Sequence, residues 1–111
     1  MDNDKIYSVE EIKNKIKENE TFLKKKYHVR GFLLFGSYAK GEQTSKSDID
    51  LLVDFQKIID MFEMVDLQNY LQDLFGKKVD LGTKNGLKSF IKKSILKEAI
   101  ALWKKELLFF F

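Results

Sequence analysis

Several residue types that build common protein sites are absent from this 111-residue sequence, or nearly so. It has no cysteine, which excludes disulfides, thiolate metal sites and cysteine nucleophiles. It has no proline and a single histidine, His28, for which the sequence offers no acid–base partner. No apolar run approaches the ~20 residues that cross a bilayer. The lack of cysteine and of a signal peptide at Met1 leads us to expect a cytoplasmic protein with no membrane partner.

The composition is that of a globular domain, with 44% hydrophobic and 33% charged residues. The length suits one domain over residues 1–111. Charge is uneven along it, because residues 1–76 carry 11 Lys and Arg against 14 Asp and Glu, whereas residues 77–111 carry nine against three. The basic segment predicts either a solvated lysine-rich helix face or a surface for a nucleotide, a nucleic acid or an acidic protein.

Hydrophobic periodicity predicts the order helix, strand, strand, helix, strand, helix. The first helix, over about residues 8–26, begins at a capping box formed by Ser8 and Glu11. The second begins at an Asp60 cap and ends near residue 75, before Gly76. A last, lysine-rich helix is expected from Leu87, Ile91, Ile95 and Ala99, which recur every four residues.

The three strands are predicted over residues 29–35, 49–55 and 78–81, with a polar loop over 41–47. Asp54, near the end of the second strand, is interpreted as a strand-end cap. The whole pattern indicates an α+β fold, an α/β sandwich in which helices flank a small mixed β-sheet.

Two carboxylates stand two residues apart at the start of the second predicted strand. Asp48 and Asp50 share one strand face because side chains alternate, which puts their Cα atoms ~7 Å apart. Such a pair favours a shared cation, and oxygen ligands suit Mg²⁺, with Mn²⁺ as an alternative. Asp80, between Val79 and Leu81, completes a three-carboxylate metal cluster if its strand lies beside the second. The alternative is that Asp48 is a turn residue and Asp50 a solvent-facing strand position.

Gly36 and Ser37 directly follow the first predicted strand, where a tight turn can lead into a short helix. Backbone N–H groups there can bind phosphate, and glycine allows its close approach; the alternative is an ordinary turn. Gly36 and Gly41 mimic the spacing of a Walker A loop, but Glu42 and Gln43 stand where that loop needs Lys and Ser or Thr. Together, the turn and the aspartates predict metal-assisted transfer from a nucleoside triphosphate, with one Mg²⁺ on the triphosphate and a second activating a hydroxyl.

The sequence Gly-Ser-Tyr-Ala-Lys-Gly at 36–41, followed by Ser-Asp-Ile-Asp-Leu-Leu-Val at 47–53, resembles the DNA polymerase beta-like nucleotidyltransferases. More narrowly, it resembles their minimal nucleotidyltransferases (MNT). The resemblance implies that Gly36, Ser37 and Lys40 bind the nucleotide. It also implies that Asp48, Asp50 and Asp80 are the catalytic, metal-binding residues. Lys40 departs from the arginine often found there, and so lacks bidentate geometry toward phosphate.

The resemblance further implies a function and a partner. MNT proteins typically act as antitoxins of HEPN ribonuclease toxins, and some transfer AMP to a toxin tyrosine. We therefore expect a Mg²⁺-dependent enzyme that transfers AMP from ATP to a tyrosine hydroxyl of a HEPN toxin in a type VII-like toxin–antitoxin system. The alternatives are an antitoxin that neutralises by binding alone, and an enzyme that modifies a small hydroxylated compound. A nucleic-acid-binding module is disfavoured because no aromatic stacking platform accompanies the lysines.

The sequence ends in five large apolar residues, Leu107 to Phe111. Such a segment is unfavourable in water, so it is expected either to pack on its own helices or to dock onto a partner or a second copy.

Overall fold

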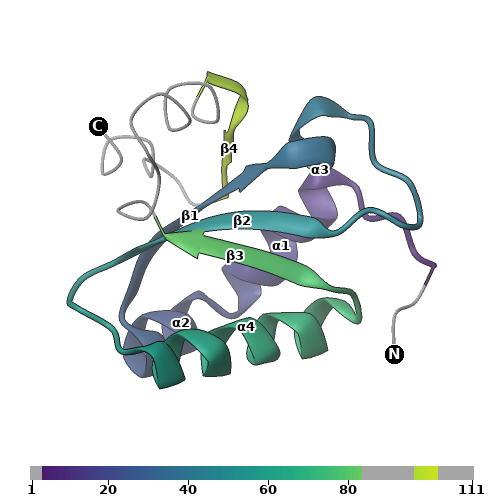
Figure 1. Cartoon of the computed structure of the whole chain (residues 1–111). Coiled ribbons are helices and arrows are strands. Elements are labelled where there is room, and N and C mark those ends of the chain that lie inside the picture. Colours follow the sequence, from purple (N-terminus) through teal and green to yellow (C-terminus); the bar gives the residue numbers. More distant parts are fainter. Residues whose placement is uncertain (1–3, 84–96, 103–111) are drawn as a thin grey trace.

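A four-stranded mixed sheet forms the centre of the computed structural model, which describes residues 4–83 and 97–102 (Figure 1). The strands are β1 (Val29–Phe35), β2 (Ile49–Phe55), β3 (Val79–Thr83) and β4 (Ile100–Ala101). Their order in the sheet is β3-β2-β1-β4; β1 pairs antiparallel with β2 and β4, whereas β2 and β3 are parallel. The predicted α+β class and mixed sheet are confirmed.

The predicted first helix is two helices, α1 (Val9–Glu18) and α2 (Glu20–Tyr27). The capping box at its start is confirmed, since the side chains and backbone N–H groups of Ser8 and Glu11 bond reciprocally. The single helix was wrong because Asn19 leaves the helical path at ψ 12°. Its side-chain amide donates to Lys15 O at 2.8 Å. Such a local side-chain hydrogen bond competes with the backbone hydrogen bonds that would continue the helix.

Three helices cover one face of the sheet, as Figure 1 shows for α1, α2 and α4 (Met61–Phe75). The predicted cap of α4 is confirmed, because Asp60 Oδ1 accepts from Glu63 N at 2.8 Å. No helix in the described ranges, the 15-residue α4 included, has the length and apolarity to span a membrane. The fully buried residues between these helices and the sheet include Ile12, Ile16, Leu23, Phe32, Leu34, Ile49, Leu51, Val53, Leu67, Leu71 and Val79.

The opposite face of the sheet carries a second, smaller apolar cluster of Leu33 and Leu52, against which Ala99 and Ala101 pack. The predicted last helix falls mainly on residues 84–96, outside the described residues. The prediction that this helix includes Ala99 was wrong, because Ala99 directly precedes β4, a strand that was not predicted from the sequence. β4 forms because the backbone N–H and C=O groups at the edge of β1 need hydrogen-bond partners. Just after β4, Leu102 N donates to Phe32 O of β1 at 3.1 Å.

Candidate active site

The three predicted carboxylates meet where β2 begins beside β3. Asp48 directly precedes β2, and the parallel register sets Asp50 beside Asp80. Because side chains alternate along a strand and Leu51 enters the helix-covered core, Asp50 lies on the opposite face of the sheet. The strand neighbours that a three-carboxylate cluster requires are therefore present.

Asp50 is the carboxyl most affected by this crowding. Burial, the negative charges of Asp80 and Asp48, and a hydrogen bond with Asp80 together raise the pKa of Asp50 to about 6, with burial the largest cause. A carboxyl beside like charges either keeps its proton or recruits a cation. Asp80 is exposed, so the cluster opens to solvent on that side.

Gly36 packs its backbone directly against Asp50. It starts the short helix α3 (Gly36–Lys40) with a left-handed φ of +72°. A Cβ at this position would overlap Asp50 Oδ2 and lie 3.0 Å from its Cγ. The first N–H groups of α3 have no side-chain cap. The fully buried Tyr38 anchors α3 in the core, so the turn is held rigidly against the carboxylates.

A turn over residues 44–47 leads into Asp48, and hydrogen bonds connect this region to the residues just before β3. Ser47 N donates to Thr44 O at 3.1 Å, and Ile49 N donates to Lys78 O at 3.0 Å. Lys77, with only 4% exposure, donates from Nζ to Ser45 O at 3.0 Å. The sequence did not single out this lysine; its place two residues before β3, the strand that carries Asp80, is the signal that could have found it.

The sequence matches the family described as Polymerase beta, Nucleotidyltransferase over residues 10–107. The chain belongs to that family. Within it, this chain is of the minimal type, since a solved putative minimal nucleotidyltransferase superposes with a TM-score of 0.72 at 28% identity, covering 85% of this chain and 95% of the other.

Two archaeal relatives of this nucleotidyltransferase carry protein adenylyltransferase names. "Putative protein adenylyltransferase MJ0128" of Methanocaldococcus jannaschii is 46% identical over 94 residues, covering 84% of this chain and 96% of the relative. "Protein adenylyltransferase MntA" of Thermococcus cleftensis is 39% identical over 95 residues, covering 86% and 96%. The chain therefore spans nearly the full length of both relatives.

Two solved structures share the fold of this nucleotidyltransferase. A toxin–antitoxin crystal structure with AMP-PNP superposes with a TM-score of 0.72 at 25% identity, covering 88% of this chain and 79% of the other. A structure of a tri-AMPylated Shewanella oneidensis HEPN toxin in complex with an MNT antitoxin gives a TM-score of 0.62 at 19% identity, with the same coverage. At that identity, the second likeness supports the fold alone.

Away from the carboxylate cluster of the nucleotidyltransferase lie Lys40, Asp54 and Arg30. Lys40, at the end of α3, lies 3.6 Å from Glu98 in an exposed ion pair. The prediction that Asp54 caps a strand end was wrong, because Asp54 is buried and paired with Arg30 at 2.6 Å. An apolar-flanked acid is costly without a partner, and Arg30 on the adjacent strand supplies one. Asp54 therefore takes no part in the carboxylate cluster, which lies at the other end of β2.

The donor set of the nucleotidyltransferase fits a hard divalent cation. Asp48, Asp50 and Asp80 offer only oxygen ligands, and a cation between them would relieve the repulsion that raises the pKa of Asp50. Among the described residues, no three His, Cys, Asp or Glu side chains are already placed so that they could hold a metal ion. Asp48 lies 3.8 Å from Lys78 Nζ. Binding a metal here requires the carboxylates to draw together.

Replacing Lys77 by Met tests whether this lysine positions Asp48. Methionine keeps the buried aliphatic part of the side chain but removes the donor to Ser45 O. The turn before Asp48 therefore loses this hydrogen bond. We expect the Mg²⁺ concentration that gives half of the ATP-dependent rise in melting temperature to increase about tenfold.

Lys25→Met is the control, since Lys25 is an exposed lysine of α2, on the helix-covered face of the sheet and away from the carboxylates. It should leave the Mg²⁺ requirement unchanged. An unchanged requirement in Lys77→Met would contradict the positioning role.

Proposed function

We propose that this nucleotidyltransferase transfers AMP from ATP to a tyrosine hydroxyl of a cognate HEPN toxin, and thereby acts as its antitoxin. The observation that carries the proposal is the contact of Gly36 with Asp50, beside Asp80 in the parallel register. This contact joins a turn suited to phosphate to carboxylates suited to Mg²⁺. The names of the archaeal relatives support protein adenylylation, and the AMP-PNP complex supports ATP.

Each residue has a role in this proposal. The backbone N–H groups at Gly36 and Ser37 hold the phosphates, with Lys40 as a further cation once it leaves Glu98. Asp48, Asp50 and Asp80 would hold two Mg²⁺ ions, which would supply charge neutralisation at the phosphates and a lower pKa of the acceptor hydroxyl.

The transfer itself needs an in-line attack on the α-phosphorus. The tyrosine oxygen forms a bond to that phosphorus, the bond to the β-phosphate oxygen breaks, and pyrophosphate leaves. Asp80 is the exposed member of the cluster, so it is placed to receive the hydroxyl proton from an incoming acceptor. The parallel register that pairs Asp80 with Asp50 keeps this base beside the half-buried carboxyl of Asp50.

The acceptor is a protein rather than a small molecule in this proposal. The protein adenylyltransferase names of the archaeal relatives favour a protein acceptor, and the structure with AMP-PNP is that of a toxin–antitoxin complex. The exposed side of the carboxylate cluster leaves room for a side chain presented by another protein.

Label transfer tests the proposed function. We would incubate the protein with Mg²⁺, the proposed HEPN partner of its own host, and ATP labelled either at the α- or at the γ-phosphate. The α-label should appear on the HEPN protein and the γ-label should not. Asp48→Asn should remove at least 99% of the transfer, because a carboxylate that binds the metal is lost. Neutralisation of the toxin without any α-label, or equal labelling by Asp48→Asn, would contradict the proposal.

A further inference from the structure

Four large apolar side chains stand exposed within eight residues around the start of α4. Their exposed fractions are 97% for Ile58, 87% for Phe62, 78% for Met61 and 48% for Val65. We call them the α4 patch. Single apolar residues on a surface are ordinary, whereas a contiguous group marks a surface that another molecule covers.

A groove of about 540 Å³ lies beside the α4 patch. Its apolar walls are formed by Val53, Phe55, Ile58, Ile59, Met61 and Met64, with Thr83 at one edge. A groove of this kind accepts the apolar anchors of an amphipathic helix, with the exposed patch extending the contact. Methionines at its wall can adjust their shape to such anchors.

The charges around the groove decide which class of partner fits. The described α4 bears Glu63, Asp66 and Asp73 but no lysine or arginine, and Asp60 caps it. Lys57 is the one basic residue that lines the groove within the described part of the chain. An anionic membrane surface would be repelled, and a second copy docked face to face would set these same carboxylates against each other. A basic protein surface is the complementary partner.

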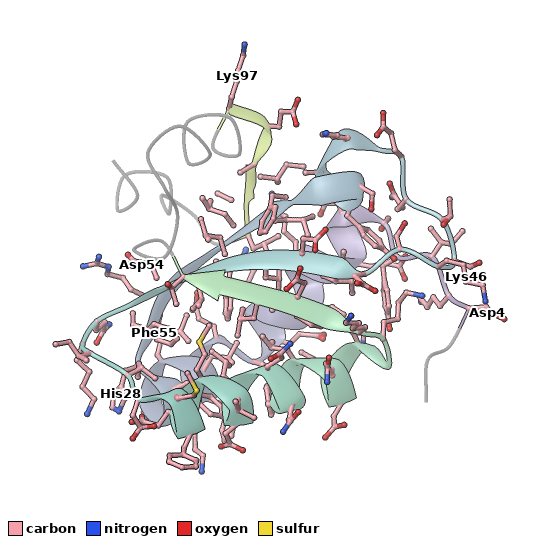
Figure 2. The ribbon with its side chains drawn as sticks, in the orientation of Figure 1. Asp4, His28, Lys46, Asp54, Phe55 and Lys97 are labelled. Atoms are coloured by element: carbon pink, nitrogen blue, oxygen red, sulfur yellow. The ribbon has the colours of Figure 1, made fainter. Side chains whose placement is uncertain are left out.

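The groove and the carboxylate cluster lie at opposite ends of β2. Figure 2 shows Lys46 at one end of the sheet and Asp54 and Phe55 at the other. Asp50 and Phe55 are five residues apart on β2, a separation of ~17 Å along an extended strand. A protein seated in the groove therefore leaves the cluster open.

We propose that the α4 patch and its groove dock an amphipathic helix with basic flanks that belongs to the acceptor protein. The acceptor is that of the proposed function, on which this docking site depends. Docking on the helix-covered side at one end of β2 holds the acceptor, while another part of it reaches round the sheet edge at β3 to the carboxylates at the other end. The site thus confers selectivity for one protein without altering the chemistry.

Kinetics of AMP transfer to the HEPN protein test the docking site. Ile58→Ser/Phe62→Ser should raise the KM for the acceptor about tenfold or more, with kcat at saturation unchanged, because anchors in a docking groove contribute to binding. The rise in melting temperature with Mg²⁺ and ATP should match that of wild type, which shows that the variant is folded and binds nucleotide. Ile6→Ser is the matched control, since Ile6 is 51% exposed but outside the patch.

Charge reversal gives a second, independent test. Glu63→Lys, at the groove end of α4, should also raise the KM, whereas Asp73→Lys, near the other end of the same helix, should not. An unchanged KM in both patch variants, with wild-type protein active, would overturn the docking site alone. Concentration-dependent dimers that Phe62→Ser abolishes, seen by sedimentation equilibrium, would overturn it in favour of a second copy. No labelling by the wild type would overturn the proposed function and the docking site together.

Discussion

Asp50→Asn is expected to stabilise the metal-free protein while abolishing AMP transfer. Partial burial and the charges of Asp80 and Asp48 make ionised Asp50 unfavourable, which is why its pKa is raised to about 6. Asparagine keeps the shape without the charge. After allowing for the partial exposure of the site, we expect the free energy of unfolding in EDTA at pH 8 to rise by about 1 kcal/mol. This corresponds to a melting temperature ~4 °C higher. The same variant should gain no stability from Mg²⁺ and ATP.

The pH dependence of this difference follows from the direction of the shift. An acid whose pKa is raised on folding contributes stability that is fully present below its ordinary pKa of 3.8 and is lost as the pH rises through about 6. The difference in the free energy of unfolding between Asp50→Asn and wild type should therefore appear between about pH 4 and pH 7, a range that includes both pKa values. Asp73→Asn, an exposed carboxylate on α4, is the control and should show no such gap. A metal-free Asp50→Asn protein less stable than wild type at pH 8 would contradict the crowding of the three carboxylates.

Gly36→Ala is expected to lower AMP transfer by a factor of about 100 or more. The left-handed backbone at φ +72° costs an alanine roughly 1 kcal/mol. The larger effect is steric, because the added Cβ would overlap Asp50 Oδ2 and force that carboxylate aside. Displacing a group that positions the reacting atoms by about 1 Å is enough for a 100-fold loss.

Gly41→Ala separates backbone strain from the clash. Gly41 has nearly the same φ, +71°, but a Cβ there meets nothing within 4 Å. It should lose about the same 1 kcal/mol of stability and keep its transfer rate. If thermal melts show both variants folded and kinetics show equal rates, the contact between Gly36 and Asp50 is not what builds the site.

Much of the sheet could be predicted because its signals are local. The apolar runs over 29–35 and 49–55 coincide with β1 and β2, and the Asp60 cap and Gly76 bracket α4. The side-by-side placement of Asp50 and Asp80 was a conditional prediction, since only pairing of β2 with β3 brings them together. The sequence supplied the residues of the candidate site, but their contacts depend on strand order.

The features that could not be predicted come from tertiary partners. β4 exists because the edge of β1 needs hydrogen-bond partners, which the periodicity of residues 87–99 does not record. Asn19 ends α1 through bonds that include one from Tyr70 OH, 51 residues away along the chain, at 2.7 Å. Lys77 is read from sequence as one more surface lysine, and only the carbonyl of Ser45 explains its burial. Asp54 was predicted to cap a strand end, because no local signal shows that Arg30 pairs with it from the neighbouring strand.

The most direct test of AMP transfer is to locate the attached group. The HEPN protein, incubated with this protein, Mg²⁺ and ATP, would be digested and sequenced by mass spectrometry, beside reactions with Asp48→Asn and without Mg²⁺. We expect AMP on a tyrosine side chain in the complete reaction only. An unmodified HEPN protein whose ribonuclease activity is nevertheless blocked would contradict it, and would mean that the antitoxin acts by binding alone.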